Sequence, residues 1–187
     1  MIRSLRRKFI LIAMLSLIGT LAFLCAAIGA GNYWVTTDRA DRAISLLFHN
    51  GGEFPPPDPD ADPSTAFGFQ VTQETPFETR YFIVTLTENQ EVTAVDAEHI
   101  AALDRQTVVE CVSDILHSGG SSGYVGYYRF GVFENEDGGS TIIALDCFLQ
   151  LQSVYNTIRV TLLVSLACAL IVFLLLAFFS GKATRPF

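Results

Sequence analysis

Two long apolar stretches without a charged residue, one near each end, constrain this chain more than any other feature. They cover residues 9–31 and 160–179. In a helix, about 20 residues span ~30 Å, which is the hydrocarbon thickness of a bilayer. The sequence therefore predicts two transmembrane helices, over residues 9–31 and 159–179, with a domain of residues 32–158 between them.

The charges are sorted around these stretches. Basic residues precede the first stretch and follow the second: Arg3, Arg6, Arg7, Lys8, Lys182 and Arg185. All 19 acidic residues lie between Asp38 and Asp146. Because Lys and Arg are retained on the cytoplasmic side, residues 1–8 and 180–187 are predicted to be cytoplasmic and the middle extracytoplasmic, in a plasma membrane. Nucleic acid is not an expected partner, because phosphate binding needs clustered basic residues.

The first stretch allows two interpretations. It follows a basic start and contains small residues that offer a cleavage site, as a secretory signal peptide does. Its apolar run, residues 9–31, is longer than the roughly 7–15 residues of a signal-peptide core. A retained membrane anchor is therefore favoured over a cleaved leader.

Residues 32–50 are predicted to continue the first helix outside the membrane. Asp38 and Arg42 form a favourable i,i+4 pair, and the segment ends at Asn50-Gly51-Gly52. Residues at helical spacing form a stripe: Tyr33, Ala40, Ala43, Ile44 and Leu47. Its partner is either the same helix of a second subunit or the core of the same chain. Small residues four apart in the spans also allow close helix contact: Ala22, Ala26 and Ala30, then Ser165 and Ala169.

Residues 53–64 are rich in Pro and Asp and are predicted to form an extended linker. Their alternating Asp residues resemble the start of a calcium loop. Pro63 stands where such a loop needs Gly, and Phe69 where it needs Glu. No metal site is predicted, and the scattered His49, His99 and His117 do not provide one.

Residues 66–148 have the pattern of a compact α+β core. Apolar alternation predicts strands over Phe67–Val71, Phe82–Leu86, Val92–Val95, Tyr124–Phe133 and Thr141–Phe148. Helices are expected over Ala97–Leu103 and Arg105–His117, capped by Asp96 and Asp104, and residues 135–139 form a hairpin turn. An antiparallel sheet with helices on one face satisfies this order, and its last strand leads directly into the second span.

Chemistry-bearing motifs are weak. Gly119-Gly120-Ser121-Ser122-Gly123 matches the pattern of a nucleophile elbow, but that elbow lies between a strand and a helix, and here the predicted order is reversed. No His follows Ser121 either, so no catalytic residue is assigned. Cys111 and Cys147 lie outside the spans, either as two buried free thiols or as a disulfide.

Several short segments resemble the membrane-bound sensor histidine kinases of bacterial two-component systems, of the Gram-positive type. They are Lys8-Phe9-Ile10, Glu78-Thr79-Arg80-Tyr81-Phe82, Gly123-Tyr124 to Tyr128-Arg129-Phe130, Leu145-Asp146-Cys147 and Lys182-Ala183-Thr184-Arg185-Pro186. The resemblance implies a PAS-like or Cache-like extracytoplasmic sensor, a homodimer, and a cognate response regulator as partner. It implies that residues 180–187 begin a cytoplasmic linker, and that ATP and Mg belong to a kinase part outside this chain.

The sequence thus favours the sensory and signal-transmitting portion of a sensor histidine kinase. For an unknown extracellular ligand, the expected contacts are Arg80, Tyr128 and Arg129, because they lie on predicted strands and can recognise an anion or a polar group. The other interpretation is that both Arg residues pair with nearby acids and that Tyr128 belongs to the core. Two other functions fit the same layout: a stand-alone two-span protein that modulates another membrane protein, and the input region of a chemoreceptor or cyclase.

Overall fold

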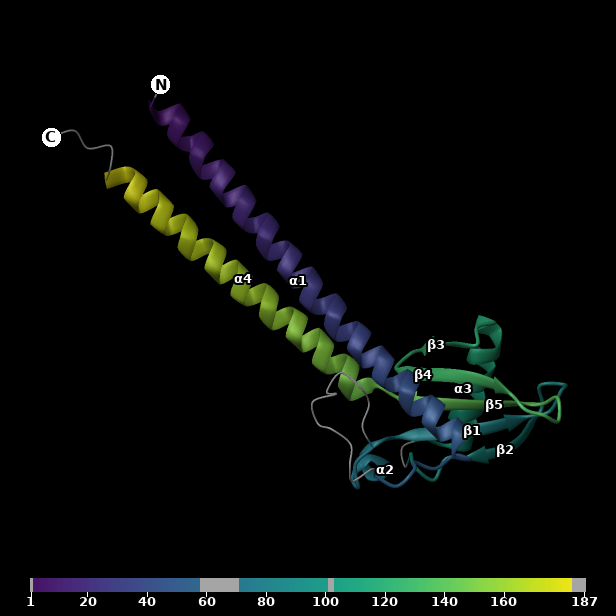
Figure 1. The fold of residues 1–187 in the computed structure, drawn as a ribbon. Coiled ribbons are helices and arrows are strands. Elements are labelled where there is room, and N and C mark those ends of the chain that lie inside the picture. The colour runs from purple at the N-terminus through teal and green to yellow at the C-terminus, as the bar shows by residue number, and fades with distance from the viewer. Residues whose placement is uncertain (1, 58–70, 101–102, 183–187) are drawn as a thin grey trace. The chain divides into compact units, whose positions relative to one another are not determined.

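The computed structural model describes residues 2–57, 71–100 and 103–182. Most of the linker predicted over residues 53–64 and of the strand predicted over Phe67–Val71 lies outside the described residues. The chain divides into two compact units, Met1–Tyr33 with Gln152–Phe187, and Trp34–Leu151. We call the first the helical unit and the second the sheet unit (Figure 1).

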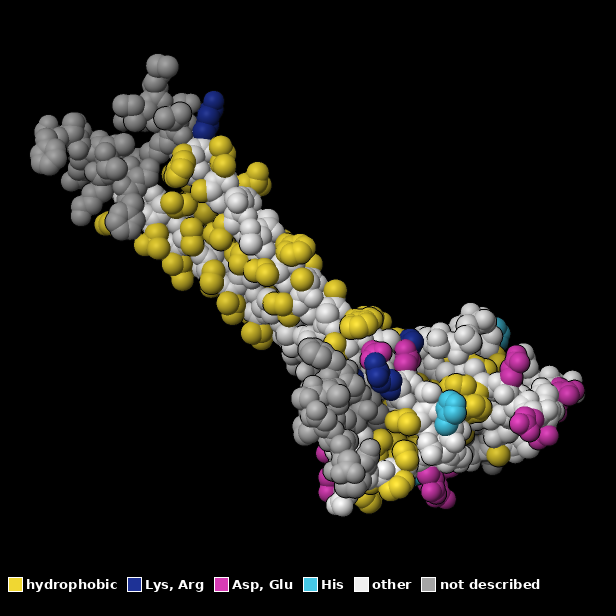
Figure 2. Space-filling model, in the orientation of Figure 1, with side chains coloured by type: hydrophobic (Ala, Val, Ile, Leu, Met, Phe, Trp, Pro, Cys, Tyr) yellow, Lys and Arg dark blue, Asp and Glu magenta, His cyan; other side chains and the backbone are white. Residues whose placement is uncertain are grey.

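The helical unit is made of parts of two long helices, α1 (Ile2–His49) and α4 (Phe148–Lys182). Both are long and apolar enough to cross a membrane, and the most apolar window of each has 0% of its residues buried. Hydrophobic side chains cover the visible surface of these helices (Figure 2). Such a surface would be costly in water, because exposed apolar area is unfavourable there. A bilayer is the solvent that removes this cost.

The two helices touch through small residues. The hydroxyl oxygen of Ser165 lies 3.3 Å from the sulfur of Cys25. Gly29 is buried, and a Cβ atom there would lie 3.2 Å from a side-chain carbon of Ile158. The helices α1 and α4 thus approach each other closely at small residues, and on α4 the expected Ser165 takes part. On α1 the contacts are made by Cys25 and Gly29, whereas Ala22, Ala26 and Ala30 are exposed.

The sheet unit contains a five-stranded sheet in the order β2-β1-β5-β4-β3, in which every neighbouring pair is antiparallel. The strands are β1 (Tyr81–Leu86), β2 (Val92–Asp96), β3 (Ser122–Val125), β4 (Tyr128–Glu134) and β5 (Ser140–Asp146). Two helices accompany them, α2 (Thr75–Glu78) and α3 (Arg105–Ser118). The predicted α+β class with an antiparallel sheet is confirmed.

Three local predictions are corrected. The strand expected over residues 124–133 is a hairpin, because Gly126, at φ 58°, turns the chain between β3 and β4. No helix forms over residues 97–100: the Asp96 carboxylate accepts a bond from the Glu98 amide at 3.1 Å and makes a turn. Helix α3 forms as expected, but the Asp104 side chain makes no cap hydrogen bond.

Helices cover both faces of the sheet rather than one. On the first face, the buried side chains of α3 pack against those of the strands: Val108, Cys111, Val112 and Ile115 against Phe82, Val84, Leu86, Phe130, Ile142 and Ala144. On the second, the end of α1 packs against the alternate strand positions: Ala40, Ala43, Ile44 and Leu47 against Tyr81, Ile143 and Leu145. We call these the α3 face and the α1 face. The part of the stripe from Ala40 to Leu47 therefore has the core of its own chain as partner, whereas Tyr33 is 48% exposed.

Glycine lets α1 lie close to the sheet. A Cβ atom on Gly131 of β4 would come within 2.9 Å of an Ile44 side-chain carbon. Beyond the helix, Gly51 and Gly52 have positive φ, and the Tyr81 hydroxyl donates to the Gly52 carbonyl at 3.0 Å. The helix therefore ends at the Asn-Gly-Gly segment as predicted.

Candidate functional site: a polar latch between helix and sheet

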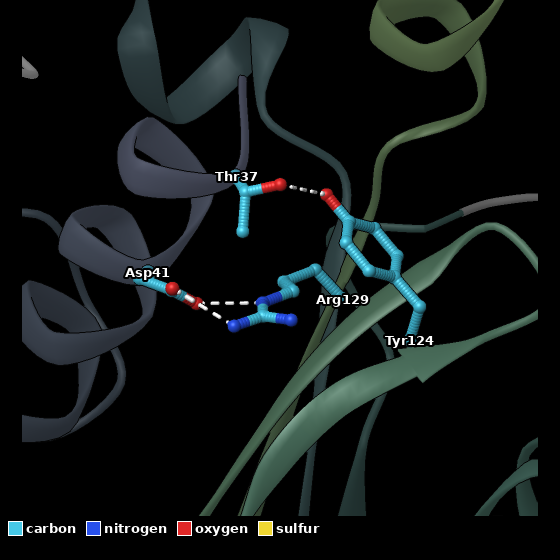
Figure 3. Close-up of polar contacts among 4 residues, drawn as sticks. All are labelled: Thr37, Asp41, Tyr124 and Arg129. Atoms are coloured by element: carbon cyan, nitrogen blue, oxygen red, sulfur yellow. Dashed lines mark hydrogen bonds and ion pairs between the residues drawn. The ribbon is translucent and has the colours of Figure 1, made fainter. Parts of the chain in front are cut away.

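The α1 face contains an ion pair that joins α1 to the sheet. Arg129 of β4 donates two hydrogen bonds to Asp41 of α1, from Nε to Oδ1 at 2.7 Å and from Nη2 to Oδ2 at 2.9 Å. The Arg129 side chain is 14% exposed and that of Asp41 45%. This bidentate geometry fixes orientation as well as distance (Figure 3).

Tyr124 adds a second connection beside the first. It lies directly across from Arg129 in the β3–β4 pair, and its ring centroid is 5.0 Å from the guanidinium carbon. Its hydroxyl lies 3.2 Å from the hydroxyl of Thr37. Thr37 and Asp41 are one helical turn apart on α1, so both point to the same strands (Figure 3). We call Thr37, Asp41, Tyr124 and Arg129 the helix–sheet latch.

The three residues predicted to bind a ligand do not share one pocket. Arg129 belongs to the latch, whereas Tyr128 packs against the α3 face, with its ring edge-on to that of Phe82 at 5.8 Å. Neighbouring residues of a strand point to opposite sides of the sheet, which separates this pair. Arg80 is exposed just before β1, and its carbonyl accepts a hydrogen bond from the Asp146 amide at 2.9 Å.

Thr37, Asp41 and Tyr124 were not identified as site residues from the sequence. A signal for them exists, because Thr37 and Asp41 are spaced i,i+4 and flank the apolar stripe at Ala40 and Ile44. The strand partner of Arg129 could not be named, since the hairpin between β3 and β4 was read as one continuous strand.

Burial sets the protonation of several groups near the core. Desolvation, with a smaller contribution from Asp96 and then Glu53, raises the pKa of Tyr81 to about 12. Desolvation also raises the pKa of Tyr128, and Asp146 and Cys111 raise it further. Both phenols are therefore neutral over the physiological range and act as hydrogen-bond donors or packing groups.

The disulfide between Cys111 and Cys147 is not formed. Both thiols are free, and they belong to opposite faces, Cys111 to the α3 face and Cys147 to the α1 face. A bridge needs Cα atoms within about 7 Å and Cβ atoms that point toward each other, and a sheet between them prevents this. Desolvation raises the pKa of each thiol to about 11, which keeps both protonated and unreactive.

The chemistry available at the latch is recognition of charge and hydrogen bonding. Within the part of the chain that the structure describes, no three His, Cys, Asp or Glu side chains are grouped to hold a metal ion. His49 and His117 each place Nδ1 2.7 Å from the carbonyl oxygen one turn earlier in their own helix. The glycine motif at residues 119–123 follows α3 and leads into β3, the reverse of the order of a nucleophile elbow.

Comparison with known proteins gives no relative: no family model, no curated protein and no solved structure matches this chain.

Proposed function

We propose that this chain is the sensory and signal-transmitting membrane portion of a sensor histidine kinase. The supporting observation is continuity between the sheet and both apolar helices. Helix α1 runs without a break through Ile2–His49, and its last turns pack on the sheet. Helix α4 begins at Phe148, two residues after β5 ends at Asp146. A change in the sheet is therefore transmitted to rigid helices with little slack.

The proposed topology places residues 1–8 and 180–187 in the cytoplasm and residues 32–158 outside. The positive-inside rule supports it, because the basic residues lie at the outer ends of the apolar segments. Acidic side chains gather over the sheet unit in Figure 2. In this proposal the sheet unit is a PAS-like or Cache-like sensor that works as a homodimer, and a response regulator receives the signal.

The latch is the proposed point of control. An anionic or polar ligand that contacts Arg129 competes with Asp41, and so favours one arrangement of α1 on the sheet over another. Couplings of this kind are typically ~1–3 kcal/mol, which matches the scale of a few hydrogen bonds. Small displacements of α1 would then change the output of the attached effector.

An insertion into the junction tests this proposal. Adding Gly-Gly after Cys147 in the full-length gene product breaks the rigid connection between β5 and α4. We expect the histidine autophosphorylation of membranes that contain the variant to stop responding to growth conditions that change the wild type. The matched control adds Gly-Gly after Asp137, in the exposed turn between β4 and β5, and keeps the response. Autophosphorylation that responds equally in both variants contradicts the proposal.

A second function is supported by the exposed small residues of α1. Ala22, Ala26 and Ala30 are exposed along one side of the helix, where another transmembrane helix can approach closely. A stand-alone two-span protein that modulates another membrane protein would use such a surface. The gene downstream of Phe187 separates the two functions: a helical linker with a His-containing motif supports the kinase, and a stop codon supports the stand-alone protein. A chemoreceptor or cyclase would show its own effector domain there.

A further inference from the structure

An open hollow of ≈ 390 Å³ lies between α3 and β2, on the opposite side of the sheet from the latch. Its lining combines apolar and polar side chains: Gln90, Val92, Val109, Val112, Ser113, Leu116 and His117. Val109 is 42% exposed, although α3 already buries its neighbours Val108 and Val112 in the core. An exposed valine at the rim of a hollow is suited to contact an apolar side chain from outside.

Gln90 and Val92 form the other wall of this hollow, and β2, which begins at Val92, is an edge of the sheet. Among the described strands it pairs with β1 alone. The β1–β2 register shifts between Thr85 and Leu86, so that Thr93 falls outside the ladder as a bulge residue. Backbone groups on an open edge can pair with an added strand. Neither Lys nor Pro, which commonly protect an edge, occurs in β2, so its protection is limited to the bulge at Thr93 and to its length of 5 residues.

Acidic side chains around the hollow favour a positively charged partner. Glu91 lies between two lining residues at the start of β2, and Glu110 is next to Val109 on α3; both are exposed. Glu88 in the preceding turn is also exposed. The sequence has no Lys between Lys8 and Lys182, and the five Arg residues of the sheet unit face all 19 acidic residues of the chain, so this unit is strongly acidic. A cationic segment gains attraction here, whereas an acidic one is repelled.

We propose that this edge binds an extended cationic peptide, which adds to β2 as a sixth strand. Backbone hydrogen bonds to β2 supply affinity, one apolar side chain enters the hollow beside Val109 and Leu116, and basic side chains lie near Glu91 and Glu110. The idea that this peptide is the signal for the kinase depends on the proposed function. The idea that it binds here depends only on the edge strand, the hollow and the charge.

Binding is tested with the full chain in nanodiscs of zwitterionic phosphatidylcholine. The probe is a fluorescent peptide of alternating Lys and Val, followed by fluorescence anisotropy. An alternating Glu and Val peptide controls for charge, and the Lys and Val peptide with N-methyl groups on both edges controls for strand pairing. We expect each control to bind at least about tenfold more weakly, because each removes one source of recognition. Equal binding of the N-methylated peptide would overturn strand addition.

Two matched variants locate the site. Glu91→Lys and Glu78→Lys change the net charge equally, and both positions are exposed, but only Glu91 adjoins the hollow. We expect Glu91→Lys to weaken binding of the Lys and Val peptide several-fold more than Glu78→Lys, and Val109→Ser to weaken it without unfolding the exposed site. Equal losses from both charge reversals would overturn the site, since they would indicate general attraction to an acidic domain. Peptide binding needs no kinase, so failure of the kinase proposal leaves these results unchanged.

Discussion

The two faces of the sheet are covered by helices with different roles. Helix α3, over Arg105–Ser118, lies entirely in the sheet unit and closes a face of apolar side chains. Helix α1 covers the other face with only its last turns, and the rest of it is an apolar helix long enough to cross a membrane. The α1 face also contains the polar latch, which the α3 face lacks among the described residues. One face thus stabilises the fold, and the other connects it to α1.

In the proposed sensor, this difference lets one small sheet be both stable and responsive to a ligand. The α3 face buries large side chains such as Phe82 and Phe130, and close packing of this kind resists gradual change. The α1 face also buries large side chains, Tyr81 and Leu47, but it adds the small residues Ala40 and Ala43 and the bidentate contact from Arg129 to Asp41, whose groups can hydrogen-bond to water instead. In the proposed sensor, a ligand that contacts Arg129 therefore shifts the packing of the α1 face at a lower cost than that of the α3 face.

The largest effect is expected from damage to the α3 face. Phe82 is fully buried there, and Phe82→Ala removes its contacts and leaves a cavity. We expect a loss of about 3–5 kcal/mol in the free energy of unfolding of the sheet unit. Urea unfolding of the full chain in micelles, followed by near-UV circular dichroism, measures it. The control Phe77→Ala changes a side chain that is 84% exposed, and should change stability by less than about 0.5 kcal/mol. If Phe82→Ala and Phe77→Ala lose the same free energy of unfolding, the α3 face does not stabilise the fold as described.

A smaller and more local effect is expected on the α1 face. Leu47 is fully buried against the sheet, and Leu47→Ala should cost about 2–5 kcal/mol. We expect the lower part of this range, because one helix can move toward the space that the leucine leaves. Hydrogen exchange should accelerate at residues 40–49 more than in α3. If the amides of α3 lose as much protection from hydrogen exchange as residues 40–49 do, the two faces are not independent.

The latch should contribute less than either apolar face. Its pair is bidentate and Arg129 is mostly buried, so a double-mutant cycle of Asp41→Asn and Arg129→Gln should give a coupling of about 1 kcal/mol. Asp38 and Arg42 supply the comparison, since they form an ion pair within α1 at 2.9 Å in which the Arg side chain is 56% exposed, against 14% for Arg129. That cycle should give about 0.3–0.5 kcal/mol. A larger coupling in the second pair would remove the argument for a special role of the latch.

The last effect concerns alkaline pH and is absent at neutral pH. Burial raises the pKa of Cys147 to about 11 from its usual 9.0, so the folded state holds a proton that the unfolded state releases. This contribution to stability is complete below pH 9 and is lost as the pH rises through about 11. The urea concentration at the unfolding midpoint should therefore fall between pH 9 and about pH 11. The fall should be less steep for Cys147→Ala than for the control Cys168→Ala. Deprotonation of Tyr81 lowers the stability further at higher pH, since burial raises its pKa to about 12. Identical slopes in the two variants would show that Cys147 is not protected by burial.

The sequence by itself determined the parts that depend on local chemistry. Uncharged runs beginning at Phe9 and Val160 predicted the two long apolar helices, and the stripe from Ala40 to Leu47 predicted the continuation of α1. Alternation in β1 and the turn at residues 135–139 predicted antiparallel strands. Periodicity and glycine conformations act over a few residues, so they can be read without the fold.

Only the tertiary structure decided which surfaces meet. It placed Tyr128 and Arg129 on opposite faces, separated Cys111 from Cys147, and gave Arg129 its partner Asp41, which lies far away in the sequence. It also divided one predicted strand at Gly126 into the hairpin that brings Tyr124 opposite Arg129. Strand register and the choice of which helix covers which face are settled by long-range packing. No local pattern encodes that packing, because both faces of the sheet bury apolar side chains.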